Sequence, residues 1–445
     1  MKKLLTAAIA AAFMLTGCKA GSSEPDAVPA GKITEIASIA EIAPDTETAE
    51  IIAAAESIPA ETSVFAEKSA EPVPAADTEA VTQKKEILPY FEAAELEEIS
   101  FYPSEEAVRH IGRFLEYDGA CYLSYTCSAV SFMMTGNRLE AKMISDANSF
   151  PEKRHCWIGV LINGELTKRF KLDEDEKTYS LYDGEMLENA EISIVKLTEN
   201  PMAASGILSI TANAKMISPT PEKALTIEFV GDSITCGYGN EASGYADGFN
   251  TAQENGLETY GYYTAQALGA EYSLVCYSGM GIISDCTTRG VKADYLLMPD
   301  IYDYCDVSFE MGRGHKSFSE WDFGNGSDIV VINLGTNDYT YTGTNESLQA
   351  EFCSAYQKFI GQVRKANPHA EIICTMGILG SELYGQIETA VQAYTEDTGD
   401  EHIHTMEFEK QRHEDGYGGD YHPSIKTHHR AAEKLTEYLQ AILDT

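Results

Sequence analysis

The sequence predicts two folded units of different class, an all-β unit over residues 98–218 and a three-layer α/β unit over residues 224–445. In the first unit, short apolar runs recur about every ten residues with turn residues between them, which is typical of an antiparallel sandwich or jelly roll. In the second unit, continuous apolar strands alternate with helical patterns, which indicates a parallel sheet covered by helices. The chain has 445 residues, enough for each unit to bury its own core.

The segment before these units has the pattern of an export signal. Lys2 and Lys3 precede an apolar run from Leu4 to Leu15, and Leu15-Thr16-Gly17-Cys18 resembles the bacterial lipobox. We therefore expect residues 1–18 to be a lipoprotein signal peptide and Cys18 to carry a lipid anchor, with an ordinary cleaved signal as the alternative. This places the protein in the bacterial cell envelope, lipid-anchored and either periplasmic or surface-exposed.

Residues 19–97 are expected to be a disordered acidic tether, because their Ala, Pro and Glu content offers too little apolar surface to offset the entropy of ordering. The whole chain has 70 acidic and 32 basic residues, a formal charge of -38. Such a polyanion repels phosphate backbones, so a nucleic-acid partner is disfavoured.

No metal or organic cofactor is expected. Nine cysteines follow Cys18, an odd number without a CxxC pair, which argues against a disulfide framework and a zinc ribbon. His402 and His404 would share one face of a strand, but no further ligand stands at metal-binding spacing, so packing or solvation is favoured over a metal.

The elements of each unit follow from local signals. Asn163-Gly164 between two apolar runs predicts a hairpin, because a type I′ turn needs positive φ at both central residues. In the α/β unit, the expected strands are residues 224–230, 272–276, 328–334 and 371–378, and the expected helices are residues 251–268, 346–366 and 426–443.

Four polar motifs lie in the α/β unit, and three of them follow strands. They are Gly231-Asp232-Ser233, Tyr277-Ser278-Gly279, Asn333-Leu334-Gly335-Thr336-Asn337-Asp338, and Asp420-Tyr421-His422-Pro423-Ser424. Singly, each could be an ordinary turn or helix cap. Functional residues of parallel sheets gather at the carboxyl ends of the strands, so together they predict an active site in which His422 acts as base on Ser233.

These motifs resemble those of the GDSL/SGNH hydrolase superfamily and, within it, carbohydrate esterase family 2. The matching blocks are "VGDSITCGYGN", "YSGMGI", "VVINLGTND" and "DYHPS", and "IGRF" resembles the domain that precedes the hydrolase domain in that family. The resemblance implies a flavodoxin-like, three-layer SGNH-hydrolase domain after an all-β jelly-roll domain. It also implies Ser233 as nucleophile, His422 as base, and an oxyanion hole made by the N–H groups of Ser233 and Gly279 with the side chain of Asn337.

The third member of a triad stays open. The superfamily commonly has an aspartate three residues before the histidine, where this chain has Gly419. Asp420, a backbone carbonyl, or no third group at all are the alternatives, and we expect Asp420 not to be essential. Tyr238, Trp321 and Asp338 are candidate substrate contacts, the aromatic ones by stacking on a sugar, with core packing as the alternative for Trp321.

The resemblance thus implies an exported carbohydrate esterase that removes O-acetyl groups from plant polysaccharides or oligosaccharides such as xylan, glucomannan or 6-O-acetyl sugars. Its expected partners are the acetylated carbohydrate and, through Cys18, the membrane. One alternative is a lipase or esterase of the same fold acting on other acyl esters, such as those of peptidoglycan. Another is an inactive carbohydrate-binding surface lipoprotein.

Overall fold

The computed structural model of the chain describes residues 88–288 and 290–444. The expected signal segment 1–18 with Cys18, and most of the expected tether 19–97, lie outside the described residues. In the described residues the chain forms two sheets within one compact unit. None of the helices found there has both the length and the apolarity needed to cross a membrane.

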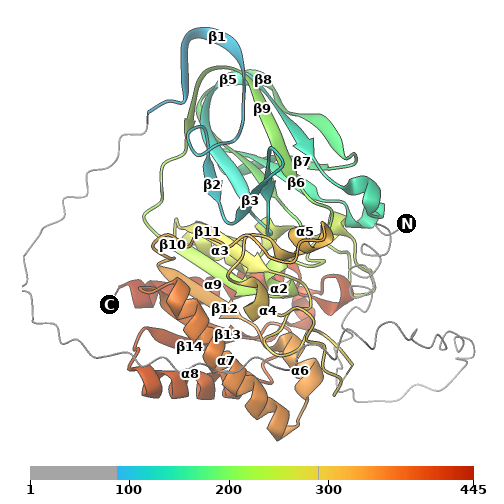
Figure 1. Cartoon of the computed structure of the whole chain (residues 1–445), viewed down its shortest axis with the longest axis vertical. Coiled ribbons are helices and arrows are strands. Elements are labelled where there is room, and N and C mark those ends of the chain that lie inside the picture. The colour runs from blue at the N-terminus through green and yellow to red at the C-terminus, as the bar shows by residue number, and fades with distance from the viewer. Residues whose placement is uncertain (1–87, 289, 445) are drawn as a thin grey trace, which may run out of the picture. The chain divides into compact units, whose positions relative to one another are not determined.

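The first sheet is antiparallel, as expected for the all-β domain (Figure 1). Its strands are β1 (Phe91–Phe101), β2 (Arg109–Ile111), β3 (Phe114–Tyr117), β4 (Ala120–Leu123), β5 (Ala129–Ile144), β6 (Trp157–Ile162), β7 (Glu165–Lys171), β8 (Glu176–Lys196) and β9 (Gly206–Pro219). The main path runs β3-β4-β9-β5-β8-β6-β7, with β1 on β9 and β2 on β5. The sheet begins before the expected boundary at residue 98, because β1 pairs with β9 along most of its length.

The expected hairpin joins β6 to β7. Asn163 and Gly164 have φ values of 52° and 82°, the left-handed backbone that a type I′ turn requires. The core of this domain comes from alternate residues of the long central strands, such as Val130 and Phe132 of β5, which are fully buried. Alternation buries one face of each strand, as the sequence pattern indicated.

The second sheet is parallel throughout. Its strands, in the spatial order β11-β10-β12-β13-β14, are β10 (Thr226–Gly231), β11 (Glu271–Cys276), β12 (Ile329–Asn333), β13 (Glu371–Met376) and β14 (Ile403–Glu407). This is the flavodoxin-like order 2-1-3-4-5, in which the first strand lies between the second and the third and its carboxyl end lies where the strand order reverses.

Helices cover both faces of the parallel sheet, which confirms the three-layer architecture (Figure 1). The α-helices are α2 (Ser233–Cys236), α3 (Tyr260–Ala267), α4 (Met298–Ile301), α5 (Val307–Gly312), α6 (Thr336–Thr342), α7 (Glu346–Ala366), α8 (Tyr384–Thr398) and α9 (Ile425–Leu443). In β12, Val330 and Ile332 pack in the cluster that contains α7 and α8, whereas Ile329 and Val331 pack in the cluster with α3 and α9. Successive side chains of a strand point to opposite faces, so a strand buried on both sides is apolar throughout.

The helix expected over residues 251–268 is shorter than predicted. Two 3-10 turns, Thr251–Gln253 and Gly256–Glu258, come first, and α3 begins only at Tyr260. The side chain of Asn255 accepts a hydrogen bond from the Leu257 N–H, and that of Thr259 accepts one from Tyr262. Asn and Thr side chains compete for backbone donors in this way and favour turns and caps over helix interiors.

A buried arginine of the "IGRF" segment joins the two domains. Arg113 forms an ion pair with Glu228 of β10 at 3.3 Å and donates to the backbone carbonyls of Tyr302 and Tyr304. Its guanidinium also lies over four aromatic rings at 5.1–5.9 Å, among them Trp321. A fully buried cation needs such partners to offset its desolvation, so Arg113 fixes the antiparallel domain on the first parallel strand.

Candidate active site

Ser233 stands at the carboxyl end of β10, an inner strand between β11 and β12. The chain leaves the sheet at Gly231, Asp232 caps the following short helix by accepting a hydrogen bond from the Ile234 N–H at 3.0 Å, and Ser233 is the first residue of α2. A residue at this helical position has no intrahelical acceptor for its own N–H. Ser233 therefore presents a hydroxyl and a backbone donor at the same place.

His422 is the partner of this serine. Its Nε2 lies 2.9 Å from Ser233 Oγ, and its Nδ1 lies 3.1 Å from the carbonyl oxygen of Gly419. A carbonyl only accepts hydrogen bonds, so Nδ1 carries the ring proton and Nε2 has the free lone pair. The lone pair faces the serine hydroxyl, which is the arrangement that a general base requires.

Burial keeps this histidine neutral. Removal from water lowers the pKa of His422 to about 4, and the Gly419 carbonyl and the charge of Asp420 oppose the shift without reversing it. A neutral imidazole at pH 7 is ready to take a proton.

Asp420 does not hold the imidazole with its carboxylate. Its Oδ2 accepts a hydrogen bond from the Tyr238 hydroxyl at 2.8 Å, while the Gly419 carbonyl occupies Nδ1 of His422. Of the three alternatives for the third group, the geometry favours the backbone carbonyl. Tyr238, a candidate substrate contact, packs its ring against the His422 imidazole at 4.2 Å between centroids, so it supports the base directly.

Gly279 supplies a backbone that a larger residue could not adopt. Its φ is +90°, and a Cβ at this position would lie 2.4 Å from Oδ1 of Asp285. Its carbonyl accepts a hydrogen bond from the Cys286 N–H at 2.9 Å. In the described part of the chain, no protein acceptor lies on the backbone N–H groups of Ser233 and Gly279, so both stay available for an oxyanion.

Asn337 bridges the two segments that carry these donors. It lies in the first turn of α6, and its Nδ2 is 3.1 Å from Oδ2 of Asp232 and 2.9 Å from the carbonyl oxygen of Met280. Asp232 precedes the serine and Met280 follows Gly279. The amide thus holds the nucleophile turn and the glycine loop together. Both of its hydrogens are used in these two bonds, so in this arrangement Asn337 orients the loop and does not donate to an oxyanion, which differs from the role that the resemblance implied.

Asp338 has a different place from the one expected. It is fully buried and accepts hydrogen bonds from the N–H groups of Ile282, Ile283 and Ser284 at 2.7–3.2 Å, so it shapes the loop after β11 and cannot touch a substrate. Burial raises the pKa of Asp338 to about 6, and these three donors oppose that shift.

Trp321 lies at the contact between the domains. Its ring meets that of Phe114 edge-on at 5.7 Å between centroids and receives the guanidinium of Arg113. No described contact links it to Ser233 or His422, so the packing alternative describes it better than sugar stacking.

His402 and His404 bind the same carboxylate. Glu371 Oε1 is 2.8 Å from Nδ1 of His402, and Oε2 is 2.7 Å from Nε2 of His404. They line a surface cavity of about 420 Å³ beside the end of α9. Among the described residues no group of three or more His, Cys, Asp or Glu side chains has the arrangement of a metal site.

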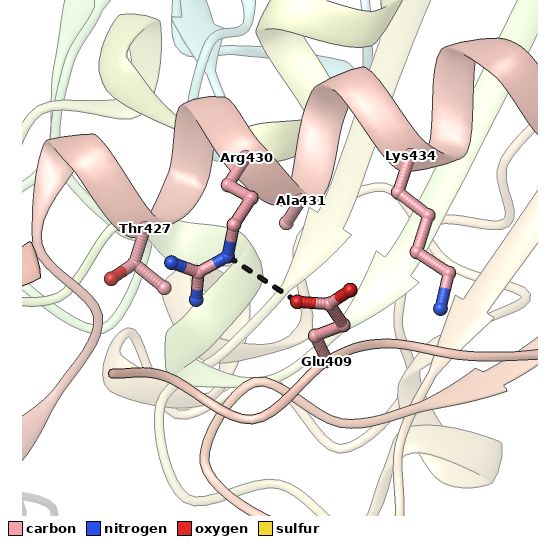
Figure 2. A pocket seen from close by; sticks show the side chains of 5 residues that line it. All are labelled: Glu409, Thr427, Arg430, Ala431 and Lys434. Carbon is pink, nitrogen blue, oxygen red and sulfur yellow. Dashed lines mark ion pairs between the residues drawn. The ribbon is translucent and has the colours of Figure 1, made fainter.

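A second, smaller pocket lies between α9 and the segment that follows β14. Figure 2 shows Arg430 on the helix directed toward Glu409, 3.8 Å from Nε to Oε2, with Lys434 one turn further on. Arg430 also pairs with Asp415, and Lys434 donates to the Glu407 carbonyl at 2.7 Å. At about 30 Å³ the pocket is too small for a substrate. It belongs to the contacts that tie the segment before His422 to the last helix.

Two exposed tyrosines beside the base were not expected from the sequence. Tyr421 precedes His422, and its ring stacks on that of Tyr245 at 4.4 Å with 15° between the planes. The two rings are 42% and 50% exposed, so together they present an aromatic face to solvent. Their loops are joined by the Gly419 N–H, which donates to Gly239 O at 2.9 Å. The adjacency of Tyr421 to His422 was the available signal, but the partner ring is far away in sequence.

Comparison with known families gives a match for each domain. A model of the GDSL-like lipase/acylhydrolase family matches residues 229–430. A model of the carbohydrate esterase 2 N-terminal domain matches residues 110–221. The two matches fall on the parallel and the antiparallel sheet respectively.

Curated relatives and solved structures agree with these matches. The chain is 32% identical over 287 residues to a cellulase/esterase, CelE, of Acetivibrio thermocellus, covering 63% of this chain and 33% of the relative, so it spans about a third of that protein. It is 28% identical over 346 residues to an acetylxylan esterase/glucomannan deacetylase of Cellvibrio japonicus, covering 77% of this chain and 90% of the relative. Among solved structures, a family two carbohydrate esterase from Clostridium thermocellum in complex with cellohexaose aligns with a TM-score of 0.65 at 27% identity, covering 76% of this chain and 99% of that one.

Proposed function

The chain belongs to carbohydrate esterase family 2, and on this premise we propose that it is a serine esterase that removes O-acetyl groups from carbohydrates. Its relatives are esterases, so the chain is an ester hydrolase. The observation that carries the serine mechanism is the 2.9 Å contact between Ser233 Oγ and the Nε2 lone pair of His422. With the lone pair so placed, the hydroxyl can lose its proton as it attacks.

In the proposed reaction, Ser233 Oγ bonds to the carbonyl carbon of the acetyl ester while its proton moves to Nε2 of His422. The carbonyl oxygen becomes an oxyanion that the N–H groups of Ser233 and Gly279 stabilise, while the Asn337 amide holds together the two segments that carry them. Each such donor is worth about 10²–10³ in rate. The sugar oxygen then leaves with the proton from His422, and an acetyl-enzyme remains.

Water completes the cycle by the same relay. It attacks the acetyl carbon as His422 takes one of its protons, and the bond to Ser233 Oγ breaks as His422 returns that proton to it. The products are acetate and the free sugar hydroxyl. The imidazolium formed in each half-reaction is supported by the Gly419 carbonyl on Nδ1, so no carboxylate is required in the triad.

Two variants test this mechanism on an aryl acetate, whose hydrolysis is read directly by absorbance. Ser233→Ala should abolish turnover and His422→Ala should reduce kcat by about 10³-fold or more, with unchanged circular dichroism. Retained turnover in Ser233→Ala would overturn the mechanism. Wild-type chain without any esterase activity would favour the non-catalytic binding alternative.

We propose acetylated plant polysaccharides or oligosaccharides, such as xylan or glucomannan, as substrates. Support comes from the acetylxylan esterase/glucomannan deacetylase relative and from the stacked pair Tyr245 and Tyr421, since exposed aromatic faces suit sugar rings. A matched series of aryl esters distinguishes the alternatives. Acetyl esters should be cleaved far faster than octanoyl esters, and the reverse order would favour a lipase.

We also propose that the protein is exported and anchored at the bacterial cell envelope through Cys18. The support is the lipobox-like Leu15-Thr16-Gly17-Cys18 after a short apolar run. Cys18→Ala should release the protein from the membrane fraction at unchanged specific activity. Continued sedimentation of the variant with membranes would disprove lipidation at this residue.

A further inference from the structure

A buried glutamate of the antiparallel domain reaches into the proposed oxyanion site. Glu199 lies between β8 and β9 and is fully buried. Its Oε2 accepts a hydrogen bond from the Ser278 N–H at 2.8 Å, and its Oε1 accepts one from the Ser278 hydroxyl at 2.7 Å. Ser278 is the residue immediately before Gly279, so one carboxylate fixes both the backbone and the side chain next to the proposed donor.

The same carboxylate touches the segment that carries the nucleophile. Oε2 of Glu199 lies 3.9 Å from Sγ of Cys236, the last residue of the short helix that Ser233 begins. Glu199 is itself held in place, because its N–H donates to Oε1 of Glu254 at 2.7 Å. Glu199 therefore contacts the residue before Gly279 and the end of the short helix that Ser233 begins.

The charges around Glu199 fit a carboxylate in this role. Burial raises the pKa of both Glu199 and Glu254. The two bonds from Ser278 and the cations Arg154 and Lys196 oppose the shift at Glu199, whereas at Glu254 the bond from the Glu199 N–H opposes it and the Glu199 charge adds to it. Glu254 also has an Oε2 atom that is buried without a partner among the described residues. The carboxylate that accepts the backbone and hydroxyl bonds of Ser278 is therefore that of Glu199, and Glu254 holds the Glu199 backbone from the other side.

We propose that Glu199 is a positioning residue for ester hydrolysis, which holds Ser278 so that the Gly279 N–H points at the developing oxyanion. The inference rests on the proposed serine mechanism. It makes the antiparallel domain a part of the catalytic apparatus, since that domain supplies the residue that aligns the oxyanion loop. A misalignment of about 1 Å at a reacting group can cost about 10²-fold in rate.

The test compares kcat with KM on an aryl acetate. Glu199→Ala removes both bonds to Ser278 and should lower kcat by about 10²-fold while KM changes by no more than about twofold, because the oxyanion exists only in the transition state. Glu199→Gln should recover most of the loss, since its amide can accept from the Ser278 N–H and donate to the Ser278 hydroxyl. Ser278→Ala keeps the N–H bond and should lose about tenfold or less.

A second readout follows the oxyanion site without turnover. The rate at which diethyl p-nitrophenyl phosphate labels Ser233, measured by mass spectrometry, should fall in Glu199→Ala and recover in Glu199→Gln. During labelling, negative charge develops on the phosphoryl oxygen, which the same N–H donors bind. The reaction does not involve hydrolysis of an acetyl-enzyme.

The matched control is Glu228→Gln. Glu228 is also a buried carboxylate at the contact between the domains, where it binds Arg113 and the Tyr302 hydroxyl. This variant should lower Tm and keep kcat. Equal losses of kcat in Glu228→Gln and Glu199→Ala, or a wild-type kcat in Glu199→Ala, would overturn the inference.

Two further outcomes keep the tests separate. If Glu199→Ala does not fold, Glu199→Asp replaces it, because a side chain shorter by one methylene cannot reach both atoms of Ser278. An unchanged kcat in Glu199→Asp would then reject the proposal. Retained activity in Ser233→Ala would reject the serine mechanism itself, whatever Glu199 does.

Discussion

The carboxylate of Asp420 accepts a hydrogen bond from the hydroxyl of Tyr238 at 2.8 Å, and the ring of Tyr238 packs on the imidazole of His422 at 4.2 Å. Asp420 thus acts on the base through an aromatic ring. Its φ of 49° lies in the left-handed region, where Asp and Asn are the non-glycine residues best tolerated. The conformation brings the Gly419 carbonyl to Nδ1 of His422.

Asp420 should therefore be dispensable in a way that His422 is not. We expect Asp420→Asn to keep kcat/KM on aryl acetate within about threefold, because Asn tolerates this backbone and can still accept from Tyr238. Asp420→Ala should lose about tenfold or less, and Tyr238→Phe should lose a similar amount. The double variant Asp420→Ala with Tyr238→Phe should lose no more kcat/KM than either single variant, if both residues act through the same hydrogen bond. A loss in Asp420→Asn equal to that in His422→Ala would instead establish a carboxylate triad.

The pH profile follows from the burial of His422. The base must be neutral, and its pKa is lowered to about 4, so activity is full above that value and is lost as the pH falls through it. We expect kcat/KM on aryl acetate to be flat down to about pH 5 and then to decline, with the fold checked by circular dichroism at each pH. An inflection near pH 7 would point to Asp232, whose pKa burial raises to about 7, as the group that controls activity.

Gly279 should not accept a side chain. Gly279→Ala places a methyl group 2.4 Å from Asp285 Oδ1 at a φ of +90°, so the loop must shift and its N–H with it. We expect kcat to fall by about 10²-fold with little change in KM. Gly385→Ala in α8 is the control, because nothing lies within 4 Å of the added atom and φ is not positive there. Wild-type kcat in Gly279→Ala would remove this residue from the oxyanion hole.

These residues show how far the sequence alone could lead. Ser233, Gly279 and Asn337 were predictable because each follows a buried parallel strand, and the carboxyl ends of such strands meet. The place of Asp338 was not predictable, because its surroundings depend on packing: its carboxylate accepts hydrogen bonds from the loop after β11. For Trp321 the sequence left core packing and sugar stacking open, and its contact with Arg113 at the domain boundary favours packing.

Glu199 illustrates the remaining limit. It lies in the antiparallel domain, and its contact with Ser278 exists only because the two domains pack in one way. No local pattern in a sequence reports such a contact. The helix expected over residues 251–268 failed for the opposite reason, since Asn255 and Thr259 are local signals that favour turns and caps over a helix interior.

The contact between the domains should depend strongly on Arg113. Arg113→Met leaves Glu228 as a buried charge without its cation and leaves the carbonyls of Tyr302 and Tyr304 without a donor. Breaking a buried pair in this way costs about 3–5 kcal/mol, measurable as a lower free energy of unfolding in urea. Arg113→Met combined with Glu228→Leu should recover part of that loss. An equal free energy of unfolding for wild type and Arg113→Met would show that the ion pair does not stabilise the fold.

The stacked tyrosines give the last prediction, which concerns polymeric substrates. Tyr245 is half exposed, stacks on Tyr421 and lies on a loop joined to the segment that carries His422, so a sugar bound at the base can extend over its ring. Tyr245→Ala should raise KM for an acetylated oligosaccharide by about three- to tenfold, the value of one aromatic contact, and Tyr245→Phe should restore it.

Aryl acetate has no neighbouring sugar ring that could lie over Tyr245, so its kcat/KM should change by no more than about twofold in Tyr245→Ala. Tyr90→Ala, which removes a 40% exposed ring from the antiparallel domain, is the matched control and should leave both substrates unaffected. Equal losses on the oligosaccharide and on aryl acetate in Tyr245→Ala would mean that the ring supports the loop around His422. An unchanged KM for the oligosaccharide and for aryl acetate would mean that the bound sugar chain extends from the site in another direction and does not contact Tyr245.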